Sequence, residues 1–232
     1  MANSQREQNR NVRENFETFF YDWLIRQQNF LDQLLVAMEP ENVHKIDTLI
    51  DQVLSHYREY FFEKTKAANK NVYLFFSPPW LSSFEKSLCW IGGFRPSVVF
   101  NLISGSIKDL STEQEQRIEQ LKAETKMEER KLTETMAEIQ ESVAGPPLLT
   151  LARKFRALVD GEVTDFNDEM DRLKDVKLGA LNKADELRGN VAFEIVKILS
   201  PSQMVNLLAA AAQFQLKVRS WGKEKDSASK VV

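Results

Sequence analysis

The sequence contains one cysteine and two histidines in 232 residues. Cys89 therefore has no partner for an internal disulfide, and no histidine lies near it in sequence to form a metal-ligand spacing. No apolar run approaches the roughly 18 residues of a membrane span, and the polar N-terminus lacks the apolar centre of a signal peptide. We expect a soluble protein of the nucleus, the cytoplasm or both.

Common enzyme motifs are also missing. The sequence has no G-x-S-x-G turn, no G-x-x-x-x-G-K-[ST] loop and no G-x-G-x-x-G. His44 and His56 would lie about 18 Å apart on one straight helix, too far to share a metal ion. Each is read as a surface or interhelical histidine, with a haem or metal ligand paired to a distant residue as the alternative. We expect no enzyme activity, no catalytic residue and no metal site.

The charge is nearly balanced, with a formal net charge of −3. This argues against a generally basic surface, and the chain contains no basic region followed by a leucine zipper, so we expect no direct binding of nucleic acid. The basic stretch 217–223 follows an apolar helix. Such helices can bind membranes or calmodulin, but this one is needed to cover a core, and we expect no membrane contact.

The hydrophobic content of 43% is arranged with helical periodicity. Apolar residues recur every three or four positions over 12–38 and 46–61, and Pro40 separates the two, which predicts an antiparallel helix pair. Ser111-Thr112-Glu113-Gln114 has capping-box spacing before a charged helix over 112–143. Its charges indicate a solvated face, with a partner-binding or dimerising helix, and hence a homodimer, as the alternative.

The second half of the chain is also predicted to be helical. Gly145-Pro146-Pro147 interrupts the helical periodicity, which resumes over 148–195. Ser200-Pro201 predicts the start of a last helix that ends near Gly222. The fold class is therefore all-α: one bundle of about seven or eight helices, with long antiparallel helices. We predict a flexible N-terminus over 1–8, one domain over 9–222 and a disordered tail over 223–232.

The most unusual segment runs from Phe76 to Ser97. The apolar run before it suggests an extended, buried connection. A helix then begins at Ser77-Pro78 or at the Ser82-Ser83-Phe84-Glu85 capping box and continues to Ile91. Gly92-Gly93 would end that helix in a close turn, and Pro96 would open the next one.

Two interpretations of this segment remain open. If the segment is a scaffold, its tryptophans are buried and Glu85 pairs with Arg95 across the turn. If it is a contact site, its tryptophan and arginine side chains are exposed and form a binding hot spot. The candidate residues for partner or ligand contact are Trp23, Trp80, Glu85, Trp90, Gly92, Gly93, Phe94, Arg95 and Pro96.

This segment resembles the W…E…W-I-G-G-F-R-P-S core of the plant seed-dormancy (delay-of-germination, DOG) domain. The same domain follows the zipper of TGACG-binding bZIP transcription factors. The aromatic helix around Trp23, the A-D-x-L-R element at 184–188 and the I-L-[ST]-x-x-Q element at 198–203 also match in the right order. The likeness covers nearly the whole chain.

The resemblance implies a stand-alone regulatory protein that acts by protein–protein interaction in seed dormancy, abscisic-acid signalling or transcription regulation. The partners it implies are type 2C protein phosphatases, bZIP transcription factors or calmodulin. A small-ligand sensor for haem or fatty acid, and a DNA-associated transcription cofactor, are the alternatives. We expect no cofactor, because the C-terminal third contains no histidine to hold haem.

Overall fold

The computed structural model describes residues 2–38, 46–143 and 160–229, with side chains over 7–38, 46–143 and 168–229. Within these ranges the chain forms eight helices and no strand, apart from one bridge between Trp90 and Gly93. The helices are α1 (Ala2–Ala37), α2 (Ile46–Lys70), α3 (Tyr73–Phe76), α4 (Ser83–Ser87), α5 (Val98–Ser106), α6 (Thr112–Val143), α8 (Asp160–Ile198) and α9 (Pro201–Ala228). The all-α prediction is confirmed.

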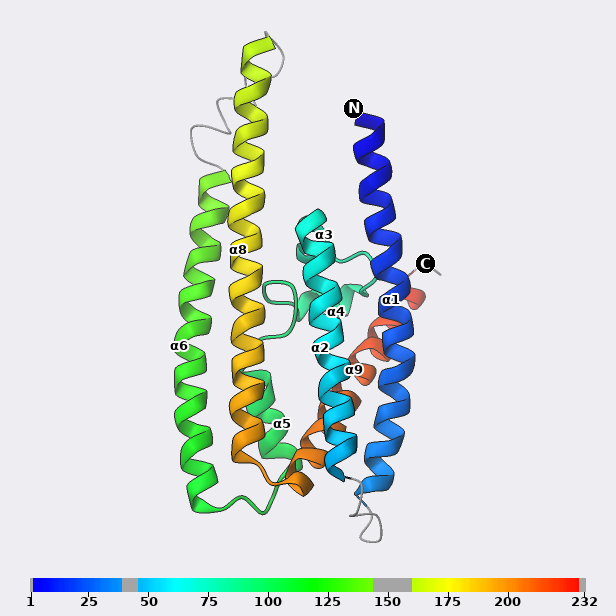
Figure 1. Ribbon diagram of the computed structural model, residues 1–232, viewed down its shortest axis with the longest axis vertical. Coiled ribbons are helices and arrows are strands. Elements are labelled where there is room, and N and C mark those ends of the chain that lie inside the picture. Colours follow the sequence, from blue (N-terminus) through cyan, green and yellow to red (C-terminus); the bar gives the residue numbers. More distant parts are fainter. Residues whose placement is uncertain (1, 39–45, 144–159, 230–232) are drawn as a thin grey trace.

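Two antiparallel helix pairs form the long sides of the molecule. Figure 1 shows α1 beside α2 and α6 beside α8, with α5, α9 and the segment that carries α4 filling the space between them. Helix α9 crosses obliquely and packs against α1, α2, α4 and α5. Among the helices of the described ranges, none combines the length and apolarity needed to cross a membrane.

The core consists of two clusters of buried apolar side chains. One lies where the C-terminal half of α1 meets α2, α5, α8 and α9, and includes Leu34, Val53, Ile103, Ile195 and Val205. The other is aromatic and surrounds the unusual segment, with Phe16, Phe20, Trp23, Phe75 and Trp80 among its members. Burial of such large apolar faces is the main force that joins the helix pairs.

Capping boxes begin two of the helices that the sequence marked. Ser200 accepts a hydrogen bond from the Gln203 amide, and the Gln203 side chain accepts one from the Ser200 amide. Ser111 and Gln114 make the same reciprocal pair before α6. Helices α6 and α9 therefore start where their sequences predict.

The predictions for residues 73–76 and for the end of α9 were wrong. Residues 73–76 form one helical turn and not an extended connection, with the amide of Phe75 bonded to the carbonyl of Val72. Helix α9 does not end near Gly222 but continues to Ala228, and Gly222 lies within the helix where it packs closely against Ser82 of the α4 cap. Pro40, His44 and Gly145-Pro146-Pro147 lie outside the described residues.

Candidate functional site

The candidate site begins at helix α4, a single turn fixed by its cap. The Ser82 hydroxyl accepts a hydrogen bond from the Glu85 amide at 3.2 Å, and the Glu85 carboxylate accepts one from the Ser82 amide at 2.8 Å. Of the two predicted starts, the capping box is therefore the one used. It also buries the Glu85 side chain, which is 8% exposed.

The prediction that this helix continues to Ile91 was wrong. Helix α4 ends at Ser87, and the chain then folds into a tight turn in which Trp90 and Gly93 exchange two backbone hydrogen bonds of 2.6 and 3.3 Å. The central residues have positive φ, 42° at Ile91 and 71° at Gly92. This is the sign combination of a type I′ turn, and it strains a β-branched residue such as Ile91.

The first glycine of the pair is required by its backbone angle and by close packing. Gly92 has a positive φ, and a Cβ atom there would collide with Cδ1 of Leu181 in α8. A Cβ atom on Gly93 would lie 3.2 Å from Cζ of Arg188, also in α8, and would require that side chain to shift slightly. The turn therefore sits directly against α8.

Arg188 holds this turn in place. Its guanidinium donates to the carbonyl oxygens of Trp90, Ile91 and Phe94 at 2.6, 3.0 and 2.8 Å. Its remaining nitrogen donates to Asp185 at 2.6 Å. The planar, multi-donor geometry of arginine suits a curved row of carbonyls, so this side chain completes the hydrogen bonding of a segment outside any helix.

Asp185 links the turn to a buried lysine of α2. Lys64 is 1% exposed and its Nζ atom donates to the Asp185 carboxylate at 2.7 Å. Burial lowers the pKa of Lys64 to about 8, although the nearby Asp185 charge acts in the opposite direction. The two polar residues of the A-D-x-L-R element thus join α2, α8 and the turn.

Glu85 forms an ion pair with Arg219, not with Arg95 as the sequence suggested. The Arg219 Nη1 atom lies 3.2 Å from Glu85 Oε1, and it also donates to the Trp80 carbonyl at 3.3 Å. Because α4 ends early, the turn directs Arg95 elsewhere. Helix α9 supplies the cation that neutralises the buried carboxylate.

Arg95 instead faces α6. Its Nη1 atom lies 3.7 Å from Glu129 Oε2, and its guanidinium covers the Trp90 ring at 5.3 Å. Glu129 also accepts hydrogen bonds from the amide and hydroxyl of Ser97, at 2.7 and 3.0 Å. Trp90 donates to the Thr133 hydroxyl at 3.0 Å. The W-I-G-G-F-R-P-S run is therefore fastened to α6 as well as to α8.

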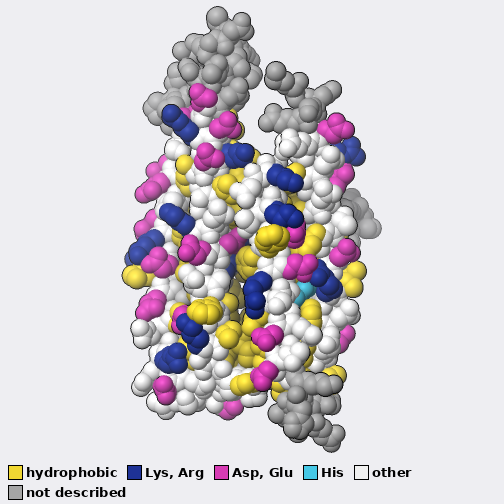
Figure 2. Space-filling view, viewed as in Figure 1, with side chains coloured by type: hydrophobic (Ala, Val, Ile, Leu, Met, Phe, Trp, Pro, Cys, Tyr) yellow, Lys and Arg dark blue, Asp and Glu magenta, His cyan; other side chains and the backbone are white. Residues whose placement is uncertain are grey.

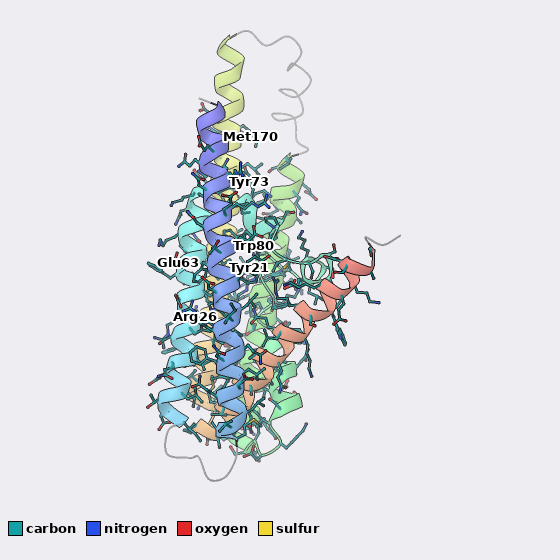
Figure 3. The ribbon with its side chains drawn as sticks, turned by 90° about the vertical axis from the view of Figure 1, so that its right-hand side faces the viewer. Tyr21, Arg26, Glu63, Tyr73, Trp80 and Met170 are labelled. Carbon is teal, nitrogen blue, oxygen red and sulfur yellow. The ribbon has the colours of Figure 1, made fainter. Side chains whose placement is uncertain are left out.

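The three tryptophans among the candidate residues are buried. Trp23, Trp80 and Trp90 are 1%, 4% and 8% exposed. Trp23 donates to the His56 carbonyl at 3.0 Å, and Trp80 packs on Phe16 at a ring distance of 4.8 Å. Arg95, 46% exposed at its side chain, is the most accessible charged member of the set. Figure 3 shows Trp80 and Tyr21 alongside α1.

A cavity of about 310 Å³ lies at the centre of these residues. Its walls come from the turn and from helices α1, α2, α3, α4, α5, α8 and α9, and Figure 2 shows a hollow on the face between α8 and α2. Most of the candidate residues line it, and Trp90 does not. The candidates that do are Trp23, Trp80, Glu85, Gly92, Gly93, Phe94, Arg95 and Pro96. Lys64 and Arg188 add two cations to an otherwise largely apolar wall.

Histidine and cysteine play structural parts in the described residues. His56 is 4% exposed and stacks on Trp23 at 4.4 Å, and burial lowers its pKa to about 4. Cys89 is half-buried with its Sγ atom 3.4 Å from the Glu85 carbonyl, and burial raises its pKa. In the described ranges, no group of three or more His, Cys, Asp or Glu residues is placed to hold a metal ion.

Sequence reasoning missed five charged residues that build this site: Lys64, Glu129, Asp185, Arg188 and Arg219. The i,i+3 spacing of Asp185 and Arg188 is a local signal for a helical ion pair. Nothing local marks Glu129 among the carboxylates of α6. Its burial depends on where the turn docks.

Known proteins resemble this chain over most of its length. The model of the seed dormancy control (DOG1) family matches residues 30–104. Protein ZW2 of Arabidopsis thaliana is 41% identical over 217 residues, covering 90% of this chain and 96% of that protein. Protein RESPONSE TO ABA AND SALT 1 of the same plant is 38% identical over 222 residues, covering 91% of this chain and 96% of that protein.

Transcription factors show a weaker likeness. HBP-1b(c38) of Triticum aestivum is 27% identical over 215 residues, which cover 88% of this chain but 63% of that protein. The similarity therefore covers most of this chain but only part of the transcription factor.

Proposed function

The chain belongs to the seed dormancy control (DOG1) family, and from this membership we propose that it is a plant regulatory protein that acts through contacts with other proteins and catalyses no reaction. The setting we propose is seed dormancy, abscisic-acid signalling or transcription regulation. The observation that carries the proposal is the match to a relative named for response to ABA and salt, over 91% of this chain and 96% of that protein.

The contacts of residues 76–97, which we call the signature segment, support this proposal. Glu85 of this segment pairs with Arg219, while Glu129 of α6 and Arg188 of α8 bond to the segment from outside. These charged groups therefore hold the fold together, and a side chain in that position is poorly placed to carry out chemistry on a substrate. The contacts favour a rigid shape, which a binding module presents to a partner.

The partners we propose are type 2C protein phosphatases, bZIP transcription factors or calmodulin, in the nucleus or the cytoplasm. The weaker similarity to transcription factors favours the second of these.

Affinity purification from maturing seed, followed by binding of each purified partner to the purified chain, tests the proposal. We expect at least one direct partner whose binding weakens in Arg95→Ala, because this arginine is half exposed beside Trp90. Arg172→Ala is the matched control, since Arg172 is 79% exposed on α8, pairs with Glu169 and does not line the cavity. If no purified protein binds the chain directly, the proposed function is wrong.

A small-ligand sensor is the second candidate, and the 310 Å³ cavity favours it. Among the described residues, no histidine lines this cavity, so it does not suit haem iron. Its apolar wall, with the half-exposed Arg95 among the lining residues, fits a fatty acid better. Native mass spectrometry and thermal shifts with haem and with a long-chain fatty acid test it, and no retained ligand with no shift would remove it.

A DNA-associated cofactor role has only the likeness to transcription factors in its favour. A gel shift by the purified chain that persists at physiological salt would support it.

A further inference from the structure

Three bulky apolar side chains are exposed where α4 meets the C-terminal half of α9. Phe84, Leu88 and Trp221 are 37%, 39% and 63% exposed. A Cβ atom on Gly222 would lie 3.4 Å from Cβ of Phe84, so Trp221 is carried directly beside α4. Figure 3 shows this part of α9 leaving the bundle, so that its outer side faces solvent.

A second hollow of about 310 Å³ continues this surface. Leu88, Trp90, Phe94 and Phe214 line it, and the rings of Phe94 and Phe214 are 5.4 Å apart. Phe214 and Trp221 are seven residues apart on α9, so they share one face of the helix. We call the group formed by Phe84, Leu88, Phe94, Phe214 and Trp221 the α4–α9 strip.

The strip is fixed before any partner arrives. The buried Glu85–Arg219 ion pair fastens α4 to α9. Asp226 of α9 accepts a hydrogen bond from the Ser83 amide at 3.0 Å, near the start of α4. A surface that is already ordered loses little conformational entropy on binding, which favours affinity.

Positive charges border the strip. Lys217 lies three residues after Phe214 and four before Trp221, on the same face of α9. It is exposed and forms no ion pair with any residue that the structure describes. Arg95 lines the hollow with its side chain 46% exposed, beside Glu129.

From this arrangement we infer that the α4–α9 strip is the docking surface for an acidic segment of a partner protein that carries bulky apolar side chains. One apolar side chain of the partner fills the hollow between Leu88 and Phe214, and another packs on Trp221. Carboxylates beside them pair with Lys217 and with Arg95, which lines the hollow. Tryptophan is enriched at binding hot spots, and complementary charge at the rim speeds association and sets specificity. The inference rests on the proposed function and assigns it a surface.

Phage display of short random peptides on the intact chain tests the inference, with synthetic copies of the selected peptides measured by fluorescence anisotropy. We expect selected peptides rich in Asp and Glu around Leu, Phe or Trp. We expect Trp221→Ala and Lys217→Glu each to weaken their binding by about tenfold. A peptide with its carboxylates changed to lysine should regain binding to Lys217→Glu.

Matched controls come from α8. Phe193→Ala removes an aromatic side chain that is 61% exposed, and Lys183→Glu reverses an exposed charge, so both should leave peptide binding unchanged. Circular dichroism and urea unfolding confirm that each variant folds before its affinity is compared.

Several results would overturn the inference. One is selection of peptides without acidic preference, or of peptides that bind Trp221→Ala as well as the parent chain. Another is a dimer, seen by sedimentation, that Trp221→Ala dissociates while no acidic peptide binds, since the occupant is then a second copy. Binding to phosphatidylserine vesicles in place of acidic peptides would make it a lipid surface. If natural partners bind directly and bind Trp221→Ala as tightly as the parent chain, the assignment of this surface is wrong and the proposed function is unaffected.

Discussion

Glu85 of α4 and Arg219 of α9 are 134 residues apart in sequence and form a buried ion pair at 3.2 Å. Their side chains are 8% and 7% exposed. The pair joins the signature segment to the last helix and positions the α4–α9 strip. Removing one partner of such a pair leaves the other charge buried without compensation.

We therefore expect Glu85→Gln to lower the free energy of unfolding by about 3 kcal/mol. Glutamine at this position retains the capping box with Ser82, so the change isolates the lost charge. Urea denaturation measures the effect. Glu14→Gln in the exposed Arg10–Glu14 pair is the control and should leave the free energy of unfolding nearly unchanged. Equal stabilities of Glu85→Gln and this control would show that Arg219 does not depend on the carboxylate.

Two glycine-to-alanine changes should have opposite signs. Gly92→Ala must accept a positive φ and a collision with Leu181, and we expect it to destabilise the fold by about 2 kcal/mol or more. Gly189→Ala, in the middle of α8 with open space at its Cβ position, should stabilise it by about 0.5–1 kcal/mol. Thermal and urea unfolding of both variants measure the difference. A stable Gly92→Ala protein would mean that the turn relaxes away from α8.

Acid should weaken the fold through His56. Burial lowers its pKa to about 4 from an unfolded value near 6.5, so the unfolded chain binds the proton first as the pH falls. The stability contributed by the neutral imidazole is complete above about pH 6.5 and is lost towards pH 4, by as much as about 3 kcal/mol. Arg26 lowers this pKa further, and Glu59 opposes it.

The variant His56→Phe isolates this contribution, because other groups titrate equally in both proteins. The difference in unfolding free energy between the parent chain and His56→Phe should change between pH 7 and pH 4.5. A difference that stays constant over this range would contradict a depressed pKa.

Arg95→Ala should hardly change the free energy of unfolding, whereas Trp80→Ala should lower it strongly. Glu129 keeps its hydrogen bonds from Ser97 when Arg95 is removed, so we expect a loss below about 1 kcal/mol. Trp80 is 4% exposed in the aromatic cluster, and its truncation should cost about 3–5 kcal/mol. Unfolding curves of the two variants make the comparison. A large loss in Arg95→Ala would disqualify it as a probe of partner binding.

Much of the local structure was predictable. The starts of α4, α6 and α9 follow from serine caps paired with Glu or Gln three residues on, since capping needs only neighbours in sequence. The glycines of the signature correctly indicated a close turn. The extent of α4 was not predictable, because Arg188 and Leu181 of a distant helix decide where the turn is held.

The division of the chain into a domain over 9–222 with flexible ends stays a prediction. The helical character, the periodicity of the long helices and the family signature were all determined by the sequence itself, because they depend on residues a few positions apart. Only the tertiary structure decided the partners of Glu85, Arg95 and Lys64. Those partners lie on helices far away in sequence, and identically charged side chains on the same helices become buried or exposed according to how the helices dock.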